Sequence, residues 1–214
     1  CPLLTKYPQG GERSIIYAVT GRKVNSSMLP ADAGCIVDNV DTVISIYMAV
    51  CKSTPLIRKI ITITGDAVNT PCNFNVKLGT NYQELIEAAG GFKEEPEKII
   101  SGGPMMGQAL FTVDIPVSKT SSALTCFTKD QVSALEPTAC IRCGRCVSVC
   151  PSRIVPVMMM QAALRNDCER FEKVNGMECM ECGSCTYICP ARRPLTQAFK
   201  EMRKTVAANR RKKG

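Results

Sequence analysis

The sequence predicts an α+β fold, with a small mixed domain in the middle of the chain and a helical region at its C-terminal end. The stretch 58–64 is rich in β-branched residues and ends at Gly65, as a strand would. Phe74, Val76 and Leu78 alternate with polar residues, which indicates a half-buried strand. Further short strands are expected at 98–101, 108–113 and 123–127.

A single helix is expected between the second and third of these strands. Thr80 and Gln83 form a capping-box pattern at its start, and Gly90 with Gly91 would end it. One helix among several short strands indicates a small α+β domain.

The C-terminal third is expected to be helical apart from its cysteine loops. Pro156 suits the first turn of a helix. Two apolar stripes then follow helical spacing. They consist of Val157, Met160, Leu164, Cys168 and Phe171, and of Leu195, Ala198, Phe199, Met202 and Val206. The methionines at 158–160 are interpreted as adaptable core residues.

The first segment is less regular. Gly10 and Gly11 form a glycine turn, and 25–34 is a second turn-rich stretch. Apolar residues recur at helical spacing over 39–51, with Asp38 or Asn39 as the cap. The sequence therefore divides into segments 1–55, 56–128 and 129–214.

Composition restricts the chemistry. The 214 residues include 14 cysteines and no histidine. Catalytic triads and metal sites that need histidine are therefore excluded, and a metal site must rest mainly on thiolates. A disulfide framework is the alternative use of many cysteines, but such frameworks are typical of small secreted domains. No signal peptide is visible in this sequence, and its hydrophobic fraction of 45% is enough for a core.

The net charge of +8 is concentrated in part at the C-terminal end, at 203–204 and 210–213. A solvated basic tail is one interpretation, and docking on an acidic partner or an anionic membrane surface is the other. Nucleic acid is not expected as a partner, because aromatic residues make up only 5% and do not interleave with the basic ones.

Two cysteine motifs carry the strongest signal. Each reads C-x-x-C-x-x-C-x-x-x-C-P, the spacing of bacterial two-cluster ferredoxins, in which the fourth cysteine binds the other cluster. The sequence therefore predicts two [4Fe–4S] clusters. One would be held by Cys140, Cys143, Cys146 and Cys189, and the other by Cys179, Cys182, Cys185 and Cys150.

Structural zinc is the competing interpretation, since zinc also accepts four thiolates. Zinc sites usually use paired C-x-x-C hooks rather than two runs of four that each end in Cys–Pro. The 28 residues between the motifs are expected to contain a helix, so a helical dicluster domain is predicted. The other six cysteines are interpreted as core residues; they are Cys1, Cys35, Cys51, Cys72, Cys126 and Cys168.

The electron donor is open from residue patterns alone. A cluster exchanges one electron, whereas most metabolic donors move two as hydride, so a flavin is needed to couple them. The turn at Gly10 and Gly11, followed by Glu12, is a weak candidate for such a site. The glycine-rich run 101–107 is a second candidate, although it also fits a tight loop after a strand.

A family resemblance narrows the choice. The chain resembles the C subunit of Rnf-type ferredoxin:NAD oxidoreductases over essentially its whole length. The resemblance is carried by both cluster motifs and by the strings KYPQGGE at 6–12, AVTGR at 18–22, DNVDT at 38–42, ITGDAV at 63–68 and ISGGPMMG at 100–107. The family's Asn–Asn–Val run appears here as Asp38–Asn39–Val40.

The resemblance implies the end of a flavin- and NADH-binding α/β domain, a β-grasp domain of the soluble-ligand-binding type, and a helical ferredoxin domain. It implies that FMN and NAD(H) bind to the full-length protein, whose glycine-rich loop would lie upstream of Cys1. Gln9, Gly10, Gly11, Glu12 and Asn39 would then line the flavin–NADH site.

The expected function is electron transfer between NAD(H), a flavin and the two clusters. The protein would be a peripheral subunit at the cytoplasmic face of the cell membrane, in an ion-translocating complex with a ferredoxin-linked subunit. Two alternatives remain at this point: a flavin and iron–sulfur cobalamin reductase, and a ferredoxin-like adaptor without its own nucleotide site.

Overall fold

The computed structural model describes residues 1–213 and divides into two compact units. One unit combines Cys1–Val37 with the chain from Glu136 onward, and the other is Asp38–Leu135. The first unit therefore joins the two ends of the sequence, with the sheet-forming region inserted between them.

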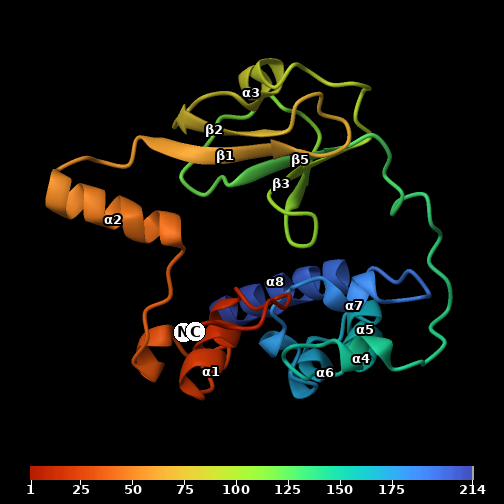
Figure 1. Cartoon of the computed structure of the whole chain (residues 1–214). Coiled ribbons are helices and arrows are strands. Elements are labelled where there is room, and N and C mark those ends of the chain that lie inside the picture. The colour runs from red at the N-terminus through yellow and green to blue at the C-terminus, as the bar shows by residue number, and fades with distance from the viewer. Residues whose placement is uncertain (214) are drawn as a thin grey trace. The chain divides into compact units, whose positions relative to one another are not determined.

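The second unit contains a mixed sheet of five strands in the order β2-β1-β5-β3-β4 (Figure 1). Strand β1 pairs antiparallel with β2 and parallel with β5, and β3 lies antiparallel to both β4 and β5. The strands are β1 (Arg58–Thr64), β2 (Cys72–Lys77), β3 (Lys98–Ser101), β4 (Gln108–Leu110) and β5 (Ala123–Phe127).

Helix α3 (Tyr82–Ala88) lies against one face of this sheet (Figure 1). In β1 the side chains of Ile61 and Ile63 are fully buried while Ile60 is exposed, so alternation puts one apolar row into the core. Tyr82 and Leu85 of α3 pack on the same core. Gly65 ends β1 with φ of 114°, and a Cβ there would lie 1.9 Å from the Cys126 carbonyl oxygen.

Helix α2 (Val40–Lys52) also belongs to the second unit. Asn39 is its N-cap, and the Asn39 side chain accepts a hydrogen bond from the Asp41 amide at 2.9 Å. Apolar side chains such as Ile44 and Tyr47 are more than half exposed, at 55% and 54%. The helix predicted over 39–51 is therefore present, but it contributes no buried residue.

The first unit is helical. Near the N-terminus it contains α1 (Glu12–Thr20) and the 3₁₀ turn η1 (Pro30–Ala33). The remaining elements are α4 (Arg145–Ser148), α5 (Pro156–Leu164), α6 (Cys168–Lys173), η2 (Gly176–Glu178), α7 (Ser184–Tyr187) and α8 (Leu195–Lys213).

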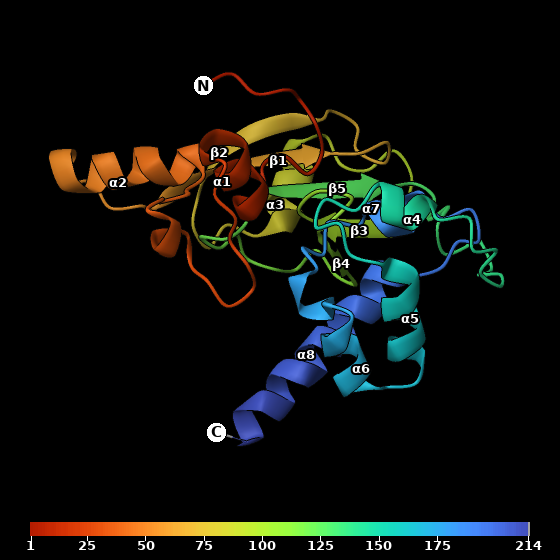
Figure 2. The ribbon, with the colours of Figure 1, turned by 90° about the horizontal axis from the view of Figure 1, so that it is seen from below.

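Helices α5, α6 and α8 pack side by side around one core (Figure 2). Phe171 of α6 and Phe199 of α8 are buried, with ring centroids 6.3 Å apart. A Cβ on Gly176 would lie 2.3 Å from the Phe171 ring, so this turn passes directly over the ring. Met159, Met202 and Val206 complete the centre of the core.

Several local expectations need correction. The capping box of α3 is formed by Asn81 and Glu84 rather than by Thr80 and Gln83. The predicted stripe that includes Leu164 is interrupted, because the chain leaves the helix after this residue and Leu164 is 66% exposed. The interpretation of the methionines at 158–160 as core residues fails for Met158, which is exposed, whereas Met159 and Met160 are buried.

The interpretation of all six remaining cysteines as core residues is wrong for Cys1 and Cys51, and Cys35 is half-buried without belonging to either core in the part of the chain that the structure describes. Cys1 and Cys51 are exposed, because neither the N-terminal end nor α2 packs against a core within the described residues. Cys126 is fully buried in the sheet core, and Cys72 and Cys168 pack at the edges of the two cores. Within residues 1–213, no helix combines the length and the hydropathy needed to cross a membrane.

Candidate metal centres

The cysteines of the two motifs line two cavities, four to each. Cys140, Cys143, Cys146 and Cys189 line the first, which has a volume of about 380 Å³. Cys150, Cys179, Cys182 and Cys185 line the second, which is much tighter, at about 20 Å³. We call these the first set and the second set. Each set takes its fourth cysteine from the opposite motif, as the spacing leads one to expect.

The backbone explains how four thiols reach one cavity. Gly144 and Gly183 precede α4 and α7 with φ of 75° and 84°, in the left-handed region that glycine enters without strain. The residues two positions earlier, Arg142 and Glu181, both have φ of 55°. Helices α4 and α7 contact each other, and this contact brings the end of each motif to the other one.

The two sets differ in exposure. Cys140 and Cys143 of the first set are exposed, whereas Cys182 and Cys185 of the second are only 8% and 9% exposed. Burial raises the pKa of the Cys179 thiol to about 11, partly offset by the Glu181 amide, which donates to its sulfur at 3.4 Å. A buried thiol resists ionisation, so the protein environment of the second set favours a ligand that supplies compensating positive charge.

The cysteines that raise one another's pKa through charge repulsion belong to the same set. Burial, and then the neighbouring Cys140 and Cys189, raise the pKa of the Cys146 thiol. Burial also raises the pKa of Cys185, where Cys182 and Cys150 add to it and a hydrogen bond involving Thr196 opposes it.

Four thiols and no histidine line each cavity. This donor set is the one that a [4Fe–4S] cluster needs, and it does not suit a metal site that requires nitrogen ligands. Among residues 1–213, no three Cys, Asp or Glu side chains form a group of the kind that holds a single metal ion. The assignment of individual cysteines to clusters therefore stays a prediction that rests on spacing and on the lining of the two cavities.

The residues expected to line the flavin–NADH site lie in different units. Gln9 and Gly10 form the turn before α1, Gly11 is the N-cap of α1, and the exposed Glu12 opens that helix. Asn39 lies in the other unit, where its side chain caps α2. The structure thus brings four of the five together, and their role in binding remains a prediction.

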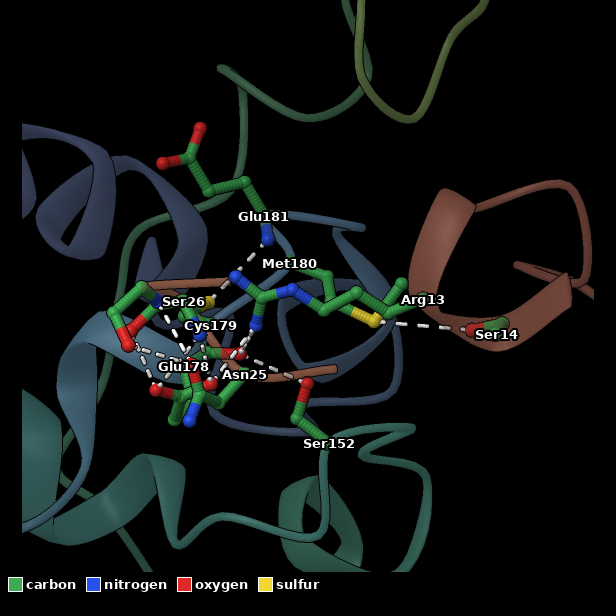
Figure 3. A network of polar contacts seen from close by, with 10 residues as sticks. Arg13, Ser14, Asn25, Ser26, Ser152, Glu178, Cys179, Met180 and Glu181 are labelled. Carbon is green, nitrogen blue, oxygen red and sulfur yellow. Dashed lines mark hydrogen bonds and ion pairs between the residues drawn. The ribbon is translucent and has the colours of Figure 1, made fainter. Parts of the chain in front are cut away.

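A polar network that the sequence did not reveal connects the N-terminal segment to the second motif (Figure 3). The Glu178 carboxylate accepts from the Arg13 guanidinium at 2.9 Å and from the Ser26 hydroxyl at 2.5 Å. Its backbone carbonyl accepts from the Ser152 hydroxyl at 3.0 Å. Burial alone would raise the pKa of Glu178, but the bonds from Ser26 and the Arg13 charge outweigh it and lower that pKa.

Comparison with known families is consistent with this architecture. The Nuo51 FMN-binding domain family matches residues 1–48, the SLBB domain family matches 60–109, and the 4Fe-4S dicluster domain family matches 134–190. The last match covers both cysteine motifs and ends at Pro190.

Similar proteins extend over nearly all of the chain. It is 45% identical over 210 residues, 98% of its length, to the C subunit of the Na(+)-translocating ferredoxin:NAD(+) oxidoreductase complex of Acetobacterium woodii, of which it covers 47%. It is 50% identical over 157 residues, 73% of its length, to the C subunit of the proton-translocating ferredoxin:NAD(+) oxidoreductase complex of Clostridium ljungdahlii, covering 34% of that protein.

The C subunit of the ion-translocating oxidoreductase complex of Rhodobacter capsulatus is 39% identical over 195 residues, which are 91% of this chain and 38% of that protein. The chain thus spans about half the length, or less, of the relatives that it matches. Because relatives from separate organisms bear the same subunit name and match along most of the sequence, the chain belongs to the family of C subunits of Rnf-type ion-translocating ferredoxin:NAD(+) oxidoreductase complexes.

Proposed function

We propose that this chain transfers electrons between NAD(H), by way of a flavin, and two [4Fe–4S] clusters in an ion-translocating ferredoxin:NAD oxidoreductase complex. The observation that carries the proposal is the division of eight motif cysteines between two cavities, four to each. Four thiolates are the ligand set of such a cluster. The activity is that of a whole protein, of which this chain spans about half.

The residues of this chain have distinct tasks in the proposal. The first set, Cys140, Cys143, Cys146 and Cys189, would hold one cluster, and the second set, Cys150, Cys179, Cys182 and Cys185, the other. The clusters supply one-electron transfer, and the flavin connects this to the hydride of NAD(H). The protein contributes the thiolates, shields the second set from water and leaves part of the first set exposed.

The division into domains is part of the proposal. Residues 1–55 would be the C-terminal part of a flavin- and NADH-binding domain, 56–128 a β-grasp domain of the soluble-ligand-binding type, and 129–214 a helical dicluster domain. The mixed five-stranded sheet with α3 against it supports the β-grasp assignment, and the three family matches support the order of the domains.

Gln9, Gly10, Gly11, Glu12 and Asn39 are proposed to line the flavin–NADH site. A Cβ on Gly10 would meet nothing within 4 Å, so the backbone there is open to close approach by a planar ring. The Glu12 carboxylate is exposed and available as a hydrogen-bond acceptor. The proposed partners are the other subunits of a membrane complex at its cytoplasmic face, including a ferredoxin-linked subunit, and no nucleic acid.

Metal analysis of the complete protein, purified without oxygen, tests the central claim. Two four-iron clusters require about eight iron and eight sulfide ions per chain, together with reduction of both clusters by NADH. Stoichiometric zinc without sulfide would contradict the proposal.

The flavin side is tested separately in the same protein. Glu12→Gln and Asn39→Ala should lower the rate of NADH-driven reduction steeply, while a chemical reductant still reduces both clusters. Asn81→Ala is the matched control, because it removes the N-cap of α3 in the sheet unit. Loss of a cap costs about 0.5–2 kcal/mol of stability and should leave NADH kinetics unchanged. If Asn39→Ala behaves like this control, Asn39 is only a cap.

A further inference from the structure

The N-terminal segment bonds to the rest of its unit at one place. Within the described residues, each side-chain hydrogen bond from 1–37 to the chain beyond 136 ends on residues 178–182, which we call the docking loop. The docking loop includes Cys179 and Cys182 of the second set. The first motif receives none of these bonds.

Glu178 is the centre of this contact (Figure 3). Its carboxylate forms an ion pair with Arg13, and both side chains are mostly shielded, at 31% and 25% exposure. The Ser26 amide donates to the two carboxylate oxygens at 3.1 and 2.9 Å. One acidic side chain thus holds two separate parts of the N-terminal segment.

The remaining contacts are close. The Tyr7 hydroxyl donates to the Cys182 carbonyl oxygen at 2.5 Å. A Cβ added to Gly11 would lie 2.6 Å from the terminal carbon of Met180, so the glycine leaves room for this methionine to pack against the start of α1. The segment is therefore fitted to the docking loop by packing as well as by charge.

We propose that the docking loop holds the flavin-binding side of the protein against the second set, with Glu178 as a positioning residue for electron exchange between them. This inference rests on the proposed function, because it takes the flavin-domain assignment of the N-terminal segment from there. The new element is that the second set, and not the first, lies next to the segment assigned to the flavin-binding domain. NADH would supply two electrons to the flavin as a hydride, the flavin would release the proton to solvent when it is reoxidised, and each of the two cluster sites would take up one electron.

The test uses the complete protein with its flavin and clusters. Glu178→Gln keeps the shape of the side chain but removes the charge that Arg13 and Ser26 share. Cluster reduction after mixing with NADH, followed by freeze-quench electron paramagnetic resonance, should slow about tenfold or more. Reduction of the flavin by NADH, and of both clusters by dithionite, should be unchanged.

A second readout separates positioning from general stability. Hydrogen–deuterium exchange of residues 1–37 should become faster in Glu178→Gln. Arg13→Gln should act in the same way, and Arg13→Lys should restore part of the rate. Glu169→Gln is the matched control, because it breaks the exposed pair with Lys173 in α6, in the same unit. A Glu178→Gln protein with wild-type exchange and wild-type cluster reduction overturns the proposal.

Removing one cluster site at a time provides a second experiment, which does not depend on Glu178. Cys143→Ala, in the first set, should leave NADH-driven reduction of the second site intact, whereas Cys185→Ala should abolish NADH-driven reduction of the first. The opposite pattern overturns the inference but leaves the proposed function standing. A wild-type protein whose clusters are never reduced by NADH would instead overturn the proposed function.

Discussion

The loops 140–150 and 179–189 repeat one backbone but place it in different surroundings. Both have a left-handed residue two positions before a left-handed glycine, and in both a four-residue helix comes next. Arg153 and Arg192, three residues after the fourth cysteine of each motif, again share nearly the same φ, 52° and 53°. The two motifs share the cysteine spacing and the glycine after the second cysteine, and these shared positions accompany the same backbone.

The surroundings differ in charge and in access to water. Arg142 and Arg193 line the first cavity, while Glu181 is the charged residue that lines the second. Arg203 of α8 forms an ion pair with Glu181 and partly offsets it. Net charge and solvent exposure both tune cluster potentials, so one motif used twice can give two sites with different affinities for electrons. The first site should have the higher potential.

Loss of the fourth cysteine gives the largest effect. Cys150→Ser should remove the cluster of the second set, although Cys150 belongs to the first motif, and Cys189→Ser should remove the cluster of the first set. Iron and sulfide should each fall from about eight to about four per chain. Electron paramagnetic resonance identifies the remaining cluster, and a signal lost from the serine's own motif would contradict the crossed arrangement.

Thiol reactivity in the folded, cluster-free chain should separate the two sets next. Alkylation requires the thiolate. Because burial raises the pKa of Cys179 from 9.0 to about 11, its thiolate fraction below pH 9 is about a hundredfold smaller than that of a thiol with the ordinary pKa. The alkylation rate of Cys179 should keep rising with pH up to about 11. Cys140 and Cys143 are exposed and should be alkylated in the first minutes of the reaction. Mass spectrometry after iodoacetamide measures this, with exposed Cys51 as the control. Equal alkylation rates for the cysteines of both sets would contradict the prediction that burial protects the second set.

Local patterns predicted more of the molecule than distant contacts did. The run of β-branched residues that ends at Gly65 located β1, because a strand signal depends on neighbours along the chain. The cysteine groups are expected from the repeated motif spacing, which also implies that the fourth cysteine crosses to the other motif. Helix α1 has one buried residue, Ile16, and so carries little periodic signal. The Arg13–Glu178 pair joins residues 165 positions apart, and no local pattern reveals such a contact.

The shared backbone predicts a matching cost at the two glycines. Gly144→Ala and Gly183→Ala each force a side chain into the left-handed region, which costs about 1–2 kcal/mol. A Cβ on Gly144 would meet nothing within 4 Å, so its cost should be purely conformational. Denaturant unfolding of the cluster-loaded protein measures both values. A much larger decrease in the free energy of unfolding for Gly183→Ala than for Gly144→Ala would show that the second loop is also sterically crowded.

The smallest effect concerns charge at matched positions. Arg142→Gln removes a positive charge beside the first set, and Glu181→Gln removes a negative charge beside the second. A reduced cluster carries one more negative charge, so the first change should lower its cluster's potential and the second should raise the other. Arg142 is exposed and screened by salt, which limits its shift to about 10–25 mV.

The Glu181 side chain is only 27% exposed, so its substitution should give the larger of the two shifts. Both substitutions narrow the difference between the two potentials, and combining them should narrow it further, because the two charges belong to separate sites. Redox titration followed by electron paramagnetic resonance resolves both clusters in one sample. A difference that stays constant would mean that solvent exposure, and not these charges, distinguishes the two sites. In that case the contrast would reside in the burial of Cys182 and Cys185, which neither substitution alters.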